Sequence, residues 1–273
     1  MPTAYPAAAA VCANCGAELH GRFCAACGQE SKPLDPPIRH FIGEFAQEFF
    51  DVDGRLLKTL RRLLFSPGFL TREHVEGRRI AWLSPLKLYL LASVAMFTVS
   101  ALAGSYSEIR LTTSDVAAVN QELQESGYAS IGELQRAIET ARLTWLPRVL
   151  FVLVPLFAGL VALLERRSRR HFPSHLVFAL HVHAAGFVAR ALAEGASMAV
   201  PASWGQGLAR VANVYILVYV FLAFRTAYGT TRLRAAVDTA VAGFVYVVLL
   251  VTAVAVIVSV AMFGSRWMAA WGS

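Results

Sequence analysis

The sequence has few charged residues: Asp, Glu, Lys and Arg together make up only 16% of its 273 residues, whereas hydrophobic residues make up 56%. Soluble globular domains carry about 25% charged residues, so this chain lacks the charge that a water-exposed surface needs. The mean hydropathy of +0.52 agrees with that deficit. Lipid is therefore the expected solvent for much of the chain, which excludes an ordinary soluble domain.

Cysteine is also scarce: the chain has four, and all of them fall between positions 12 and 27. Cysteines confined to so short a segment do not form a disulfide framework across the chain, and a cytoplasmic location would keep them reduced. The Ala-rich stretch before Cys12 lacks the charged start and the apolar segment of a signal peptide. We therefore expect no cleaved signal.

Sequence motifs for catalysis are missing as well. The chain contains no GxSxG, no HExxH, no P-loop and no paired carboxylates on a common helix. Enzymatic activity is therefore not predicted, and a membrane-bound redox or lipid-modifying enzyme stays only as an alternative.

Five long apolar runs predict membrane-spanning helices. A helix needs about 20 apolar residues to cross about 30 Å of hydrocarbon, and backbone in lipid must satisfy its own hydrogen bonds. The predicted fold class is an all-α polytopic membrane protein, with a transmembrane bundle over residues 85–263 and a short C-terminal tail over 264–273. The five spans are expected at residues 85–104, 146–164, 175–200, 208–224 and 236–263.

The net charge of +7 comes largely from arginines that flank these runs, such as Arg78-Arg79 and Arg166-Arg167. Cytoplasmic loops of membrane proteins carry such an excess of Lys and Arg. The polar segment 105–144 carries six acidic and three basic residues and is expected outside the cytoplasm. We therefore predict a multi-pass protein of the bacterial inner (plasma) membrane, with a cytoplasmic N-terminus and an extracytoplasmic C-terminus. This placement of the arginines disfavours nucleic-acid binding.

Two copies of one short motif lie within residues 1–31, the predicted zinc-knuckle (zinc-ribbon-like) head. Each copy is a CxxCG sequence, whose spacing lets two thiolates converge on one ion and whose glycine allows a tight turn. Four thiolates make a closed tetrahedral site, so the sequence predicts a structural zinc ion, with iron binding and thiol redox chemistry as alternatives. The predicted ligands are Cys12, Cys15, Cys24 and Cys27.

A proline-rich linker follows the head, and residues 32–84 as a whole are expected in the cytoplasm. Apolar residues at spacings of three and four between Ile38 and Phe65 predict two amphipathic helices, which are broken at residues 51–54 and ended by Ser66-Pro67-Gly68. Basic residues on the second helix suit a headgroup surface. Packing against the bundle or against another protein fits the pattern equally well.

The third predicted span carries ionisable side chains along one helix face. At 100° per residue, His175, His183, Arg190 and Glu194 fall within an arc of about 100°. Ionisable groups at membrane depth usually pair or line a wet cavity, so this set is a candidate intramembrane polar site, and Arg190 and Glu194 are candidates for a pair. In the structural alternative, His175 lies at the inner membrane interface, and the side chains of Arg190 and Glu194 extend to the outer one. Only His183 then lies deep in the membrane.

Several short sequences resemble those of an uncharacterised family of bacterial membrane proteins. Before the first span they are Cys27-Gly28-Gln29, Asp51-Val52-Asp53-Gly54, Thr59-Leu60, Ser66-Pro67-Gly68 and Gly77-Arg78-Arg79, and at the third span they are His171-Phe172 and His175-Leu176-Val177-Phe178. That family has an N-terminal zinc-knuckle segment and is classed as a domain of unknown function. The resemblance implies a zinc head joined to a membrane bundle, and it implies no activity.

A membrane-anchored partner-binding or regulatory module is the function that the sequence favours, because most of the recognisable motifs lie before the first span. The expected partners are the lipid bilayer and a cytoplasmic protein, and a homo-oligomer is left open. The alternative from a different class is a transporter or channel for an ion or small solute, based on His183, Arg190 and Glu194 in the third span.

Overall fold

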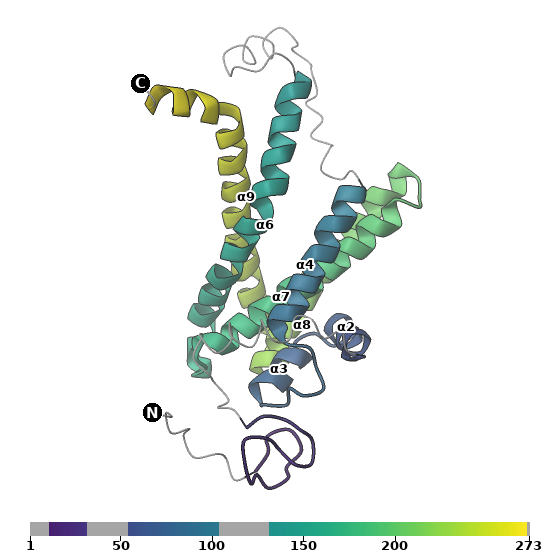
Figure 1. Ribbon diagram of the computed structural model, residues 1–273, viewed down its shortest axis with the longest axis vertical. Coiled ribbons are helices and arrows are strands. Elements are labelled where there is room, and N and C mark those ends of the chain that lie inside the picture. Colours follow the sequence, from purple (N-terminus) through teal and green to yellow (C-terminus); the bar gives the residue numbers. More distant parts are fainter. Residues whose placement is uncertain (1–10, 32–53, 104–130, 272–273) are drawn as a thin grey trace.

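The computed structural model describes residues 11–31, 54–103 and 131–271 of the chain, and helices form most of these ranges (Figure 1). Strand-like pairing within them consists of two isolated antiparallel bridges in the head. The predicted all-α fold is confirmed. The helices are α2 (Arg55–Phe65), α3 (Phe69–Val75), α4 (Pro85–Leu102), α6 (Ile131–Leu164), the short 3-10 helix η1 (Arg166–Ser168), α7 (Phe172–Ser197), α8 (Ala202–Tyr228) and α9 (Arg232–Trp271).

Five of these helices are long and apolar enough to cross a membrane, as the sequence predicts. The buried share of a spanning segment ranges from 11% in the least buried to 50% in the most buried. Many apolar side chains therefore face outward, where lipid can cover them. The chain is therefore a multi-pass membrane protein. The spanning segments are Pro85–Leu102, Thr144–Leu164, Phe172–Ser197, Trp204–Tyr228 and Arg232–Val260.

Two helices extend beyond the segments expected to span. α6 begins at Ile131, so residues 131–143 of the segment predicted to be polar and extracytoplasmic are helical. α9 continues through most of the predicted C-terminal tail to Trp271. The first predicted amphipathic helix, between Ile38 and residue 50, and residues 105–130 lie outside the described residues.

Helix α7 is the centre of the bundle, because it contacts α4, α6 and α8 as well as the short helices α2 and α3. Every residue from Val177 to Ala185 is buried, and several of these residues are alanines, whose small side chains allow neighbouring helices to approach closely. The other long helices arrange around this segment: α6 runs beside α9, and α4 runs beside α7 (Figure 1).

The segment between the head and α4, residues 54–84, forms a platform against the bundle. Gly68 links α2 and α3 with a φ of +78°, and a Cβ added there would lie 2.7 Å from the Ala223 carbonyl oxygen of α8. Just before this link, the Tyr215 hydroxyl of α8 donates to the Leu64 carbonyl oxygen at 2.7 Å. The platform therefore packs directly on the spanning helices.

Helix α2 has the amphipathic character that its sequence predicts. On one face Leu63 is 1% exposed against the bundle, whereas Leu57 and Phe65 on another face are each 79% exposed. The sequence left three environments open for this helix: a headgroup surface, the bundle or another protein. The structure shows that the bundle covers one of its faces. Helix α3, which the sequence analysis did not identify, buries Leu70 and Thr71 against the same bundle.

Candidate metal centre

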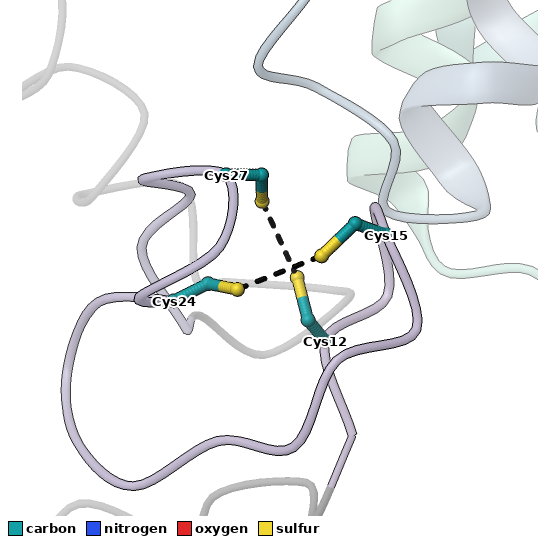
Figure 2. A group of neighbouring side chains, drawn as sticks. All are labelled: Cys12, Cys15, Cys24 and Cys27. Atoms are coloured by element: carbon teal, nitrogen blue, oxygen red, sulfur yellow. Dashed lines mark hydrogen bonds between the residues drawn. The ribbon is translucent and has the colours of Figure 1, made fainter.

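The four cysteine side chains of the head point toward one another (Figure 2). The Sγ atoms of Cys12 and Cys27 are 3.7 Å apart, and those of Cys15 and Cys24 are 3.6 Å apart. All four sulfur atoms lie within 4.8 Å of one another. Metal–sulfur bonds of about 2.3 Å at tetrahedral angles place the sulfur atoms about 3.8 Å apart. The cluster therefore has the dimensions to hold one tetrahedral metal ion.

The two CxxCG loops have the same internal backbone hydrogen bonds. In each loop the N–H of the glycine donates to the carbonyl oxygen of the first cysteine at 2.8 Å, Gly16 to Cys12 and Gly28 to Cys24. Gly16 has a φ of 77° and Gly28 a φ of 75°, in the left-handed region that glycine adopts without steric cost. Two equivalent loops thus bring the cysteines together as two matched pairs.

An isolated β-bridge closes the chain around each loop, joining Val11 to Glu18 and Phe23 to Glu30. In each loop, the N–H of the first cysteine also donates to the carbonyl oxygen of the residue after the glycine. This distance is 2.7 Å from Cys12 to Ala17 and 2.9 Å from Cys24 to Gln29. The conformation of each loop is therefore fixed by its own backbone hydrogen bonds. A bound metal would link one loop to the other.

The backbone also changes the acidity of the thiols. The N–H groups of Cys27 and Ala26 lower the pKa of the Cys24 thiol to about 7. The N–H of Ala17 lowers the pKa of Cys15, but the Cys24 thiol, burial and the thiols of Cys27 and Cys12 together raise it to about 12. Metal binding displaces protons from such thiols, so the affinity of the centre for a metal depends on pH.

Gln29 fastens the head to the platform at residues 77–80, which we call the docking loop. Its side-chain amide donates to the Gly77 carbonyl oxygen at 2.7 Å. Its Oε1 atom accepts from the backbone N–H groups of Arg79 at 3.1 Å and Ile80 at 3.2 Å. The sequences Cys27-Gly28-Gln29 and Gly77-Arg78-Arg79, which are far apart in the chain, thus meet in space.

The docking loop is itself held by the platform helices. The Arg78 guanidinium donates to both carboxylate oxygens of Glu73 at 3.0 Å and also pairs with Glu76. Its hydrogen bonds lower the pKa of Glu73 and are the main cause of that shift. Arg55 of α2 donates to the Ile80 carbonyl oxygen at 3.1 Å. The head is therefore connected to the bundle through a fixed loop.

The polar residues predicted on the third span share α7 but have separate partners. His175 Nδ1 lies 2.8 Å from the Tyr228 hydroxyl of α8, with the two rings stacked. His183 Nδ1 lies 2.8 Å from the Ala179 carbonyl oxygen of its own helix, and the ring packs against Phe157 and other aromatic rings.

The other two residues of this set pair with each other. Arg190 donates to Glu194 at 2.9 Å, and the second carboxylate oxygen of Glu194 accepts from the buried Ser100 hydroxyl of α4. From His175 to Glu194 the helix rises by about 28 Å, at about 1.5 Å per residue. The four side chains therefore do not form one compact site.

Two buried polar contacts were missed by sequence reasoning. His181 Nδ1 lies 3.0 Å from the Thr71 hydroxyl of α3, and no spacing in the sequence connects these residues. At the other contact, Asp238 of α9 is 1% exposed and accepts from Arg234 at 2.8 Å. The spacing of four residues between Arg234 and Asp238 is a signal that could have identified this second pair.

The fold and the site together define a multi-pass membrane protein with a candidate four-cysteine metal centre docked at one end of its bundle. Residues 53–97 match the family model described as "Protein of unknown function (DUF3667)". The matched segment runs through the platform into α4 and does not include the cysteine head. No curated protein and no solved structure matches the chain.

Proposed function

We propose that this protein is a membrane-anchored module that presents a zinc-bound head to a cytoplasmic protein partner. The observation that carries the proposal is the docking of the head: Gln29 bonds it to the docking loop, and the platform packs on α7 and α8. A head fixed in this way keeps one orientation relative to the membrane. A recognition surface gains affinity from such preorganisation, whereas a flexible metal carrier would not need it.

Zinc is the ion that we assign to the centre. Thiolate ligands at tetrahedral separations suit zinc, and four of them leave no open position for a substrate. Within residues 11–31, Cys12 and Cys24 are the buried residues, so the head has no apolar core of its own. Metal binding would therefore supply much of the folding free energy of the head, which makes the centre structural.

The head exposes apolar side chains that a protein partner would cover. Val11 is 53% exposed and Phe23 is 58% exposed, and each directly precedes the first cysteine of its loop. The Arg22 guanidinium lies 5.5 Å from the centroid of the Phe23 ring. Aromatic residues and arginine are enriched at the energetic centres of protein interfaces. This surface is the proposed contact with the partner.

We place the head and the platform in the cytoplasm. The head lies at one end of the molecule, and the C-terminal end of α9 lies at the other (Figure 1). Arginines cluster after α6, at Arg166 and Arg167, and on both sides of the link between α8 and α9, at Arg225 near the end of α8 and Arg232 at the start of α9. By the positive-inside rule these loops face the cytoplasm. The resemblance of the sequence motifs to bacterial membrane proteins is the reason for assigning the bacterial inner membrane.

The proposal is tested by the proteins that copurify with the full-length chain from membranes. Three variants should lose the same partner: a deletion of residues 1–37, the double substitution Cys15→Ser with Cys27→Ser, and Phe23→Ala. Trp204→Ala, at a 70% exposed position outside the head, is the control and should retain that partner. If the deletion leaves every copurifying protein unchanged, the proposal is wrong.

Transport through the bundle is the second candidate function, and its support is the pair of Arg190 and Glu194, in which Glu194 also accepts from the Ser100 hydroxyl of α4. Polar groups of this kind in apolar helices often mark ion pathways. Proteoliposomes that contain the wild-type chain or Arg190→Ala separate the two candidates. An ion flux that the substitution abolishes would establish transport and replace the first proposal.

A further inference from the structure

The end of α6 and the start of α9 form a buried polar cluster that the proposed function does not use. Glu165, directly after α6, is 6% exposed, and Asp238 in α9 is 1% exposed. Asp238 accepts from Arg234 at 2.8 Å, and Arg234 also donates to the carbonyl oxygen of Leu164 at the end of α6. One arginine thus joins two helices beside two buried carboxyl groups.

Glu165 has an oxygen atom that the described part of the chain does not satisfy. Its Oε1 atom is fully buried and has no hydrogen-bond partner there. Arg234 brings Asp238 to the end of α6, because it donates both to Asp238 and to the carbonyl oxygen of Leu164, the residue before Glu165. Two ionised carboxyl groups offer only acceptors, so a hydrogen bond between them requires a proton on one of the two. Such a proton also removes a charge from a buried position, where charge is costly.

Charged and titratable groups face Glu165 from several elements. Arg234 and Asp238 come from α9, and Arg170 comes from the link between η1 and α7. Arg170 donates through Nη2 to the Ala227 carbonyl oxygen at 2.7 Å and lies 4.8 Å from the Tyr228 ring centroid, whereas its Nη1 atom is buried and has no hydrogen-bond partner in the described part of the chain. Tyr228 of α8 is in electrostatic reach of Glu165.

His175 of α7 is a further titratable group, and it is hydrogen-bonded to Tyr228. Two arginines therefore oppose two acids, and of the two Arg234 donates to a carboxylate of the pair, whereas Arg170 donates to a backbone carbonyl oxygen of α8. Burial, followed by the charge and hydrogen bond of Asp238, raises the pKa of Glu165 to about 7, against the opposing effects of Arg234 and Arg170.

We propose that Glu165 and Asp238 form a site that binds one exchangeable proton and that this proton fastens the end of α6 to α9. With the proton bound, the two carboxyl groups share a hydrogen bond and Arg234 neutralises the remaining charge. When the proton leaves, the two buried carboxylates repel each other, and the contact between α6 and α9 weakens. The site is separate from the metal centre and does not depend on the function proposed for the head.

The first test is the pH dependence of thermal unfolding of the full chain in detergent. A carboxyl group whose pKa is raised in the folded state stabilises the fold below its unfolded pKa, and this contribution is lost as pH rises through the folded value. The wild-type protein should therefore lose stability relative to Glu165→Gln as pH rises from about 4.5, the ordinary pKa of a glutamate, and the loss should be complete once the pH exceeds the folded pKa of about 7.

Glu133→Gln is the matched control, because Glu133 is an exposed acid in α6, the helix that ends directly before Glu165. Its unfolding temperature should follow the wild-type curve at every pH. A difference between wild type and Glu165→Gln that stays constant with pH would overturn the proposal.

Infrared difference spectroscopy gives a second test that does not depend on unfolding. The wild-type protein should show the carbonyl stretch of a protonated carboxyl group that disappears as pH rises through about 7, and this band should be absent from Glu165→Gln. Persistence of the full band in Glu165→Gln, or its absence from the wild type below neutral pH, would overturn the assignment.

Discussion

Gly68 is the position where an added methyl group should separate the platform from the bundle. Its φ is +78°, and a Cβ there would lie 2.7 Å from the Ala223 carbonyl oxygen and 2.9 Å from the Cβ of Thr226. A left-handed backbone costs a residue other than glycine about 1–2 kcal/mol. Overpacking against backbone that cannot yield costs about 1–3 kcal/mol more. Gly68→Ala should therefore lower the free energy of unfolding by about 2–5 kcal/mol.

Substitutions at two other glycines allow the backbone cost and the overpacking cost to be measured separately. Gly229 has a φ of +68° but no heavy atom within 4 Å of an added Cβ, so Gly229→Ala should cost only the backbone term of about 1–2 kcal/mol. Gly243 lies inside α9 in open space, and Gly243→Ala should raise stability by about 0.5–1 kcal/mol. Reversible unfolding by SDS in mixed micelles measures all three. Equal losses for Gly68→Ala and Gly229→Ala would refute the reasoning, because the contact with Ala223 would then contribute nothing.

Three further predictions concern the metal centre, the docking of the head and α7. Cys15→Ser with Cys27→Ser should remove about one bound zinc per chain, and unchanged metal content by mass spectrometry would refute the assignment. Gln29→Ala should keep the zinc but speed up amide hydrogen exchange in the docking loop, because three hydrogen bonds are lost; unchanged exchange would contradict the docking. Arg190→Ala should destabilise the bundle by about 1–3 kcal/mol, because the 12% exposed side chain of Glu194 loses its charged partner. A loss below about 0.5 kcal/mol in the SDS assay would show that this pair contributes little.

The four-cysteine cluster and the five spanning helices could be predicted because both depend on local sequence. Two cysteines separated by two residues reach one ion wherever the loop lies, and a run of about 20 apolar residues is long enough to cross a membrane whatever packs beside it. The pair of Arg190 and Glu194 also follows from local spacing, since the two residues are one helical turn apart.

The contacts that assemble the molecule could not be predicted in this way. The sequence places a turn at Gly68, but it does not show that α8 lies 2.7 Å away from a Cβ at that position. It also does not connect Gln29 with Gly77, or Thr71 with His181. Helical periodicity places His175 and His183 on one face, but their separate partners come from the folding of the whole bundle.

The central claim is that the docked head presents a surface to a protein partner, and photo-crosslinking in native membranes tests this claim most directly. A photoreactive amino acid replaces Phe23 of the full-length chain, or Trp204 as the exposed control. We predict a discrete adduct with one protein from position 23, none from position 204, and loss of the adduct when Cys15→Ser and Cys27→Ser are added. The absence of a protein adduct at position 23, or the same adducts at both positions, would contradict the account.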